Sequence, residues 1–165
     1  VLATTGYNES QKNTIEDWAR QVPIVMTSNF SIGMTIINKM LKTCQWEIAQ
    51  YFDCDILEIH HEQKKDKPSG SALMLKKTLQ GPATDRYGYQ KPISVTSLRH
   101  RQIAGEHTVI LCGDHEQITI THTADSREIF VRGILEAVEA IPYLKPGLFS
   151  MEDLLAQRFL QRRQL

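Results

Sequence analysis

The stretch Asp55–Leu75, written DILEIHHEQKKDKPSGSALML, decides how this chain folds and where its chemistry lies. Asp55 to Glu62 is predicted to be a β-strand, because branched and apolar residues are interrupted there by charged ones. Neighbouring side chains on a strand point to opposite faces, so His60 and His61 cannot share one role or one metal ion. Pro68 stops the charged turn that follows, so a new element has to begin after it.

That new element is predicted to be a helix capped by Ser69, whose apolar side would bury Ala72, Leu73, Leu75 and Leu79. Gly70 lets a ligand approach the backbone closely. The free N–H groups of Gly70 and Ser71, the helix dipole and nearby Lys64 all favour a bound carboxylate or phosphate. The plain alternative is a strand, a charged turn and an ordinary capped helix. Two imidazoles beside an ammonium group favour proton transfer to a bound acid instead.

Composition limits the classes of function that the chain can have. A chain of 165 residues with 41% hydrophobic content is enough for a compact core, and its net charge of zero argues against nucleic-acid partners and a strongly anionic membrane surface. There is no apolar run long enough to span a bilayer and no signal peptide, so we expect a cytoplasmic protein. The three cysteines, Cys44, Cys54 and Cys112, are predicted to be reduced core thiols, and no zinc-binding spacing is present.

The remaining elements predict an α+β fold. Residues 1–30 are typical of strand, helix and strand, with a capping box at Asn8 and Gln11, and one long helix is predicted from Ser31 to about Tyr51. In the first of these helices, the residues expected to face inward are Ile15, Trp18, Ala19 and Val22. Three further strands are expected at Ile93–Leu98, His107–Cys112 and Gln117–His122, the last two joined by a turn at Gly113 and Asp114. Ser126 is predicted to cap a helix that buries Ile129, Phe130, Ile134, Val138 and Ile141, and Ser150 with Asp153 a last one that packs Leu154, Leu155 and Phe159.

Four motifs carry a resemblance to a known family. EIHHEQKKDKPSGSA, from Glu58 to Ala72, resembles the signature of the dihydrodipicolinate reductases (4-hydroxy-tetrahydrodipicolinate reductases), which usually contains H-x(3)-K-x-D-x-P-S-G-T-A. Ser71 stands where that family usually has threonine. The other motifs, in family order, are VLATTGY at Val1–Tyr7, SNFSIG at Ser28–Gly33 and AGEHTV at Ala104–Val109.

The resemblance implies a fold and a division into domains. It implies a mixed four-stranded sheet with flanking helices, attached to the tail of a Rossmann-type dinucleotide-binding domain. Residues 1–30 would be that tail, residues 31–125 the substrate-binding and oligomerisation domain, and residues 126–165 the helices that return to the dinucleotide domain. The family forms tetramers through this sheet, so a homo-oligomer is expected, a tetramer or a dimer. A solvated sheet face is the alternative.

The resemblance also implies a reaction of lysine and diaminopimelate synthesis, the reduction of a cyclic dicarboxylate by NADH or NADPH. His60 would be the proton donor and Lys64 the second catalytic residue. Substrate contacts would come from five residues: His61, Ser69, Gly70, Ser71 and Arg127. Peripheral cofactor contacts would come from five others: Thr4, Thr5, Ser28, Asn29 and Phe30. No metal ligand is implied.

The glycines leave alternatives open. A reductase of this type needs a glycine-rich turn for the cofactor pyrophosphate, and no two of the chain's nine glycines are spaced G-x-G. We therefore expect an N-terminally truncated chain, because the sequence begins at Val1 inside a strand. Two alternatives remain: a non-catalytic substrate-binding and oligomerisation module, or a lyase or isomerase that uses His60 and Lys64 as an acid/base pair.

Overall fold

The computed structural model describes residues 1–4 and 6–162, and the chain divides into two compact units. The sheet unit comprises Ile36–Arg127, and the terminal unit comprises Val1–Thr35 and Glu128–Leu165. The division of the chain into three domains at residues 30 and 125 stays a prediction.

The sheet unit is built on four strands in the order β3-β2-β4-β5. These strands are β2 (Asp53–His60), β3 (Ser94–Arg99), β4 (Gly105–Gly113) and β5 (Glu116–Ala124). β2 pairs with β3 in parallel and with β4 antiparallel, so the sheet is mixed, and the expected α+β class is confirmed. The turn between β4 and β5 lies at Asp114 and His115, one residue later than predicted, and His115 adopts a positive φ of 65°.

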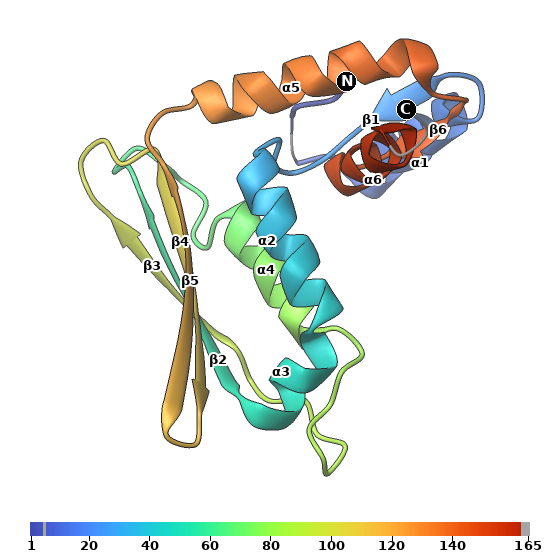
Figure 1. The fold of residues 1–165 in the computed structure, drawn as a ribbon. Helices are drawn as coiled ribbons and strands as arrows, with labels where there is room; N and C mark the ends of the chain where they lie inside the picture. The colour runs from blue at the N-terminus through green and yellow to red at the C-terminus, as the bar shows by residue number, and fades with distance from the viewer. Residues whose placement is uncertain (5, 163–165) are drawn as a thin grey trace. The chain divides into compact units, whose positions relative to one another are not determined.

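One face of the sheet is covered by helices, which Figure 1 shows beside the strands. They are α2 (Ile32–Thr43), α3 (Gln45–Tyr51) and α4 (Gly70–Gln80). Alternate residues of β2 are buried, from Cys54 to His60, because a strand turns every second side chain to the same face. Ser69 caps α4 as predicted, its hydroxyl accepting from the N–H of Ala72.

Two helix predictions in this unit were wrong. The single helix expected from Ser31 to about Tyr51 is interrupted at Cys44, whose φ is −103° and ψ is 13°. Thr43 donates its hydroxyl hydrogen to the carbonyl of Lys39 at 2.9 Å, a back-bond that bends helices. Leu73 is 49% exposed, because Ala72, Leu75 and Leu79 define the buried face of α4 and Leu73 lies beside that face.

The terminal unit pairs two short parallel strands, β1 (Pro23–Val25) and β6 (Gly147–Phe149). Its helices are α1 (Glu9–Ala19), α5 (Glu128–Ala140), η1 (Ile141–Tyr143) and α6 (Met151–Arg162). The capping box of Asn8 and Gln11 is present at α1, and the hydroxyl of Ser150 accepts from the N–H of Asp153 at α6. The strand β6 was not predicted, since three residues after two prolines carry too little periodicity to read.

Several residues expected inside this unit lie at its surface. Ile15 and Ala19 are buried, but Trp18, Val22 and Val138 are each more than half or about half exposed. Trp18 instead borders an apolar hollow of about 240 Å³ whose lining includes Leu2, Tyr7, Gln11 and Thr14. Phe130, Ile134 and Ile141 do pack on the core around Val25 and Phe30. The expected packing of Phe159 lies outside the side chains that are described.

Exposure also corrects the expectation for the cysteines. Cys54 is buried, whereas Cys44 and Cys112 are exposed free thiols. Burial, the largest influence, raises the pKa of the Cys54 thiol to about 11. Among the described residues, no helix combines the length and the apolar character needed to cross a membrane.

Candidate active site

Glu58 lies at the centre of a polar cluster on the helix-covered face of the sheet. The strand register places it between Ser97 of β3 and His107 of β4, and it is 0% exposed. Its Oε1 atom lies 3.1 Å from Nη2 of Arg99 and accepts a hydrogen bond of 3.2 Å from the N–H of Ser69. Burial alone would raise the pKa of Glu58, but its contacts with Ser69, Ser97 and Arg99 lower it to about 2. Glu58 is therefore a buried, ionised carboxylate.

His60 stands on the same strand face as Glu58, two residues further along β2. Its Nδ1 lies 2.8 Å from Oε2 of Glu58, at an angle outside that of a formed hydrogen bond. Burial lowers the pKa of His60, Glu58 raises it, and the charges of Lys64 and Arg99 lower it further. The net direction is downward. The ring therefore accepts a proton less readily than a histidine in water.

His107 joins His60 to the start of helix α4. The two rings meet edge to face with centroids 5.0 Å apart, and Nε2 of His107 lies 3.0 Å from the hydroxyl of Ser69. Burial is the main cause that lowers the pKa of His107 to about 4, with His60 adding to it. His107 is thus neutral at neutral pH. Its contacts link β4 to the start of α4.

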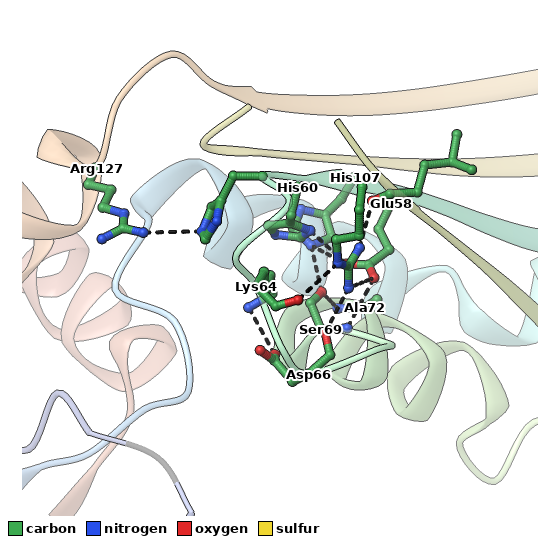
Figure 2. A network of polar contacts seen from close by, with 11 residues as sticks. Glu58, His60, Lys64, Asp66, Ser69, Ala72, His107 and Arg127 are labelled. Atoms are coloured by element: carbon green, nitrogen blue, oxygen red, sulfur yellow. Dashed lines mark hydrogen bonds and ion pairs between the residues drawn. The ribbon is translucent and has the colours of Figure 1, made fainter. Parts of the chain in front are cut away.

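The turn after β2 is held against the cluster by its own charges, as Figure 2 shows. Lys64 Nζ lies 2.8 Å from the carboxylate of Asp66, and Arg99 donates to the carbonyls of Lys64 and Asp66 at 3.4 Å and 2.7 Å. Burial would raise the pKa of Asp66, but the hydrogen bonds from Lys64 and from backbone N–H groups, including that of Gly70, lower it overall. Asp66 therefore occupies part of the anion-binding position that the sequence predicts at the start of α4.

His61 and Arg127 form a separate pair near the end of the sheet unit. Nη2 of Arg127 lies 3.1 Å from Nε2 of His61. A guanidinium group only donates hydrogen bonds, so Nε2 of His61 is the acceptor in this contact. Neither residue joins the Glu58 cluster.

The Glu58, His60 and His107 side chains also offer ligand atoms within 4.8 Å of one another. A divalent cation there would lie beside the guanidinium of Arg99, which already contacts Glu58 at 3.1 Å. Repulsion from that fixed positive charge disfavours a metal at this position.

The residues expected to contact a cofactor lie in the terminal unit. Thr4 bonds to the hydroxyl of Tyr7, and the amide oxygen of Asn29 accepts from the N–H of Ser31 at 2.7 Å. The side chain of Phe30 is 4% exposed and packs in the core, so only its backbone can meet a ligand. Ser28 lies in the same loop, and Thr5 lies outside the described residues.

The structure places Ser69 beside His107, and Lys64 and Gly70 beside Asp66. The sequence assigned no role to Glu58, Asp66 or Arg99. Glu58 and Asp66 stand inside the family-like motif, so their position was the available signal. Arg99 gave none, because it reaches Glu58 only through the parallel pairing of β3 with β2.

The fold and the cluster define a class of protein. An α+β domain that sets an ionised glutamate and two imidazoles beside a helix start has the groups for proton transfer next to an anion. The family model described as the C-terminus of dihydrodipicolinate reductase matches residues 33–155. The chain belongs to the dihydrodipicolinate reductase family.

Curated relatives agree with this assignment. The 4-hydroxy-tetrahydrodipicolinate reductase of Caldanaerobacter subterraneus subsp. tengcongensis is 38% identical, over 94% of this chain and 66% of that protein. Those of Clostridium novyi and Stenotrophomonas maltophilia are 37% and 40% identical, over 96% and 94% of this chain and 67% and 62% of their own lengths. The chain thus spans about two thirds of the length of these relatives.

A solved structure supports the fold. The dipicolinate-bound dihydrodipicolinate reductase from Paenisporosarcina sp. TG-14 matches with a TM-score of 0.65 at 20% sequence identity, covering 90% of this chain and 61% of that one.

Proposed function

We propose that this chain forms the substrate-binding part of a 4-hydroxy-tetrahydrodipicolinate reductase of lysine and diaminopimelate biosynthesis. The reaction would reduce a cyclic dicarboxylate with NADH or NADPH. One observation carries the proposal: Ser69 both caps α4 and contacts His107, so the acid–base cluster adjoins the helix start where a carboxylate would bind. The family relationship supports the proposed reaction, and this geometry supports the proposed choice of residues.

In the proposed reaction the substrate gains a hydride on one atom and a proton on its neighbour. His60 would hold that proton, because its ring is the one that adjoins both Glu58 and the turn of Lys64. A bound dianion raises the pKa of a nearby imidazole, since it stabilises the charged form. Substrate binding would thus load His60 with the proton that the reaction consumes. Binding and protonation become linked events.

The carboxylates of the substrate would be held by separate groups. The first N–H groups of α4, at Gly70 and Ser71, and the ammonium of Lys64 favour one carboxylate. Because Asp66 contacts both Lys64 and the N–H of Gly70, that carboxylate has to displace Asp66 or share its partners. Arg127 and His61 would serve the other carboxylate, with Arg127 as a charged donor.

The chain's fit to a nicotinamide cofactor is incomplete. A backbone cradle for pyrophosphate needs closely spaced glycines, and none of its nine glycines provides the G-x-G spacing. Thr4, Thr5, Ser28, Asn29 and Phe30 would supply only peripheral contacts. Cytoplasmic location, expected from the sequence, stays a prediction.

A homo-oligomer through the sheet is part of the proposal. The sheet face opposite the helices carries Leu57, Ile110 and Leu98, and Thr108 and Thr121 bond across it at 3.1 Å. Leu98 is 37% exposed, and a flat face of branched and apolar residues suits packing on a second copy. Sedimentation that shows a monomer at micromolar concentration would contradict it.

Calorimetric titration with dipicolinate tests the substrate site. We expect the chain to bind this planar dicarboxylate, and Lys64→Gln to weaken binding about tenfold, the value of one charge-assisted contact. Lys67→Gln is the matched control, because Lys67 is an exposed lysine of the same turn. No binding at millimolar dipicolinate, or equal weakening by both variants, would contradict the proposal.

The second candidate is a non-catalytic substrate-binding and oligomerisation module, which the missing G-x-G spacing favours. Titration with NADPH separates the two. Tight binding by this chain would exclude the module. Dipicolinate binding without NADPH binding at high concentration would exclude catalysis by this chain alone. Turnover without any nicotinamide would support a lyase or isomerase instead.

A further inference from the structure

We propose that Glu58 is a positioning residue for His60: its carboxylate holds Nδ1 of the imidazole and stabilises the protonated ring, so that Nε2 carries the transferable proton. The inference rests on the proposed function, in which His60 supplies the proton. Glu58 itself touches no reacting atom. It acts through the ring of His60.

The hydrogen-bond partners of Glu58 define this role. Its Oε1 is occupied by Arg99 and by the N–H of Ser69. Its Oε2 and Nδ1 of His60 are both buried, and neither has a hydrogen-bond partner among the described residues. The two atoms lie 2.8 Å apart. Because buried polar atoms are nearly always paired, each is the partner of the other, and a small rotation of the ring completes the bond.

This pairing fixes which nitrogen faces away from the carboxylate. With Nδ1–H directed at Glu58, the second nitrogen, Nε2, lies on the side of Gly105. A Cβ atom at Gly105 would lie 3.1 Å from Nε2, closer than most side-chain contacts. Glycine at this position therefore leaves space for the ring of His60. Gly105 has no positive φ that would itself require glycine. The requirement for glycine therefore comes from the ring.

The charges around His60 show why a glutamate is needed there. Lys64 and Arg99 oppose a positive charge on the ring, and Glu58 and Asp66 favour it. Asp66 is exposed and already bound to Lys64, and His107 contacts the ring as a neutral group. Glu58 is the buried anion that faces His60. Without it, a protonated His60 would face two cations with only an exposed, engaged carboxylate to compensate.

The test combines NMR titration of the His60 ring with calorimetry of dipicolinate binding, on the chain and on Glu58→Gln. We expect the variant to lower the His60 titration midpoint, to reduce proton uptake on binding, and to weaken binding at neutral pH about tenfold. Glu62→Gln is the control, since Glu62 is an exposed glutamate two residues beyond His60. Glu58→Asp keeps the charge, so its His60 titration midpoint should lie between those of Glu58→Gln and the unchanged chain.

Each outcome is decisive. An unchanged His60 midpoint in folded Glu58→Gln would overturn the inference, whether or not dipicolinate binds. A lowered midpoint in a chain that binds no dicarboxylate would support the pairing while refuting the proposed function. Where Glu58→Gln does not fold, Gly105→Ala takes its place, because it displaces the ring without removing a charge. We expect that variant to bind dipicolinate about tenfold more weakly, and wild-type binding with an unchanged midpoint would overturn the inference.

Discussion

Replacing Ser69 with alanine should destabilise the sheet unit more than any ordinary helix-cap substitution. Ser69 is 1% exposed, and its hydroxyl makes two contacts, one of 3.2 Å with the N–H of Ala72 and one of 3.0 Å with Nε2 of His107. Losing the cap costs about 1 kcal/mol. Leaving the buried ring nitrogen without a partner costs about 1–3 kcal/mol more. We therefore expect the free energy of unfolding to fall by about 2–4 kcal/mol.

Ser150→Ala is the matched comparison, because Ser150 caps α6 through a similar bond of 3.2 Å to the N–H of Asp153. That bond is exposed and joins no buried ring, so we expect a loss of about 1 kcal/mol. Urea unfolding would be followed by amide signals of α4 for the first variant and of α6 for the second. Equal losses would refute the reasoning, since they would mean that the contact with His107 contributes nothing.

Three further predictions concern pH, packing and charge. Burial lowers the pKa of His107 from 6.5 to about 4. Its contribution to the free energy of unfolding is therefore complete above pH 6.5 and is lost as the pH falls through about 4. Acid titration of unfolding should show a loss of up to ~3 kcal/mol between these two pH values, and His107→Asn should remove that loss. Gly133→Ala should destabilise the terminal unit by about 3 kcal/mol, because its Cβ would lie 1.8 Å from the carbonyl oxygen of Phe30; Gly70→Ala, with no atom within 4 Å of its Cβ, should change urea stability by less than about 1 kcal/mol. Asp66→Asn should tighten dipicolinate binding about threefold at low salt, because it frees Lys64 and removes a like charge; weaker binding by calorimetry would show instead that Asp66 positions Lys64.

The sequence predicted the features that depend on neighbouring residues. The cap at Ser69, the capping box at Asn8 and the strand through Glu58 and His60 each depend on contacts a few positions apart, so their residue types are sufficient to place them. The hinge at Cys44 was missed because Thr43 and Lys39 suit a helix in every respect except the back-bond between them. Features that depend only on nearby residues could therefore be predicted from the sequence.

Contacts between distant strands could not be predicted in the same way. Arg99 and Glu58 are 41 positions apart, and their contact follows from the parallel register of β2 and β3. The exposure of Trp18 and Val138 depends on which side of each helix contacts a neighbouring element. Periodicity alone does not determine which residues at the edge of the apolar side are covered. The charges that surround His60 therefore became visible only in the fold.

The contacts of Ser69 also restrict which residues at the start of α4 can bind an anion. Its N–H is donated to Glu58, its hydroxyl contacts Ala72 and His107, and its carbonyl accepts from the N–H of Leu73 at 3.0 Å. Every polar group of Ser69 is thus engaged within the domain, and a ligand that bound to it would have to break one of these buried bonds. The cost of such a break is about 1–3 kcal/mol. In the proposed function a carboxylate would bind one residue further along, at the backbone of Gly70, where it would have to displace Asp66. Ser69 then contributes to ligand binding by fixing the start of α4 against the acid–base cluster.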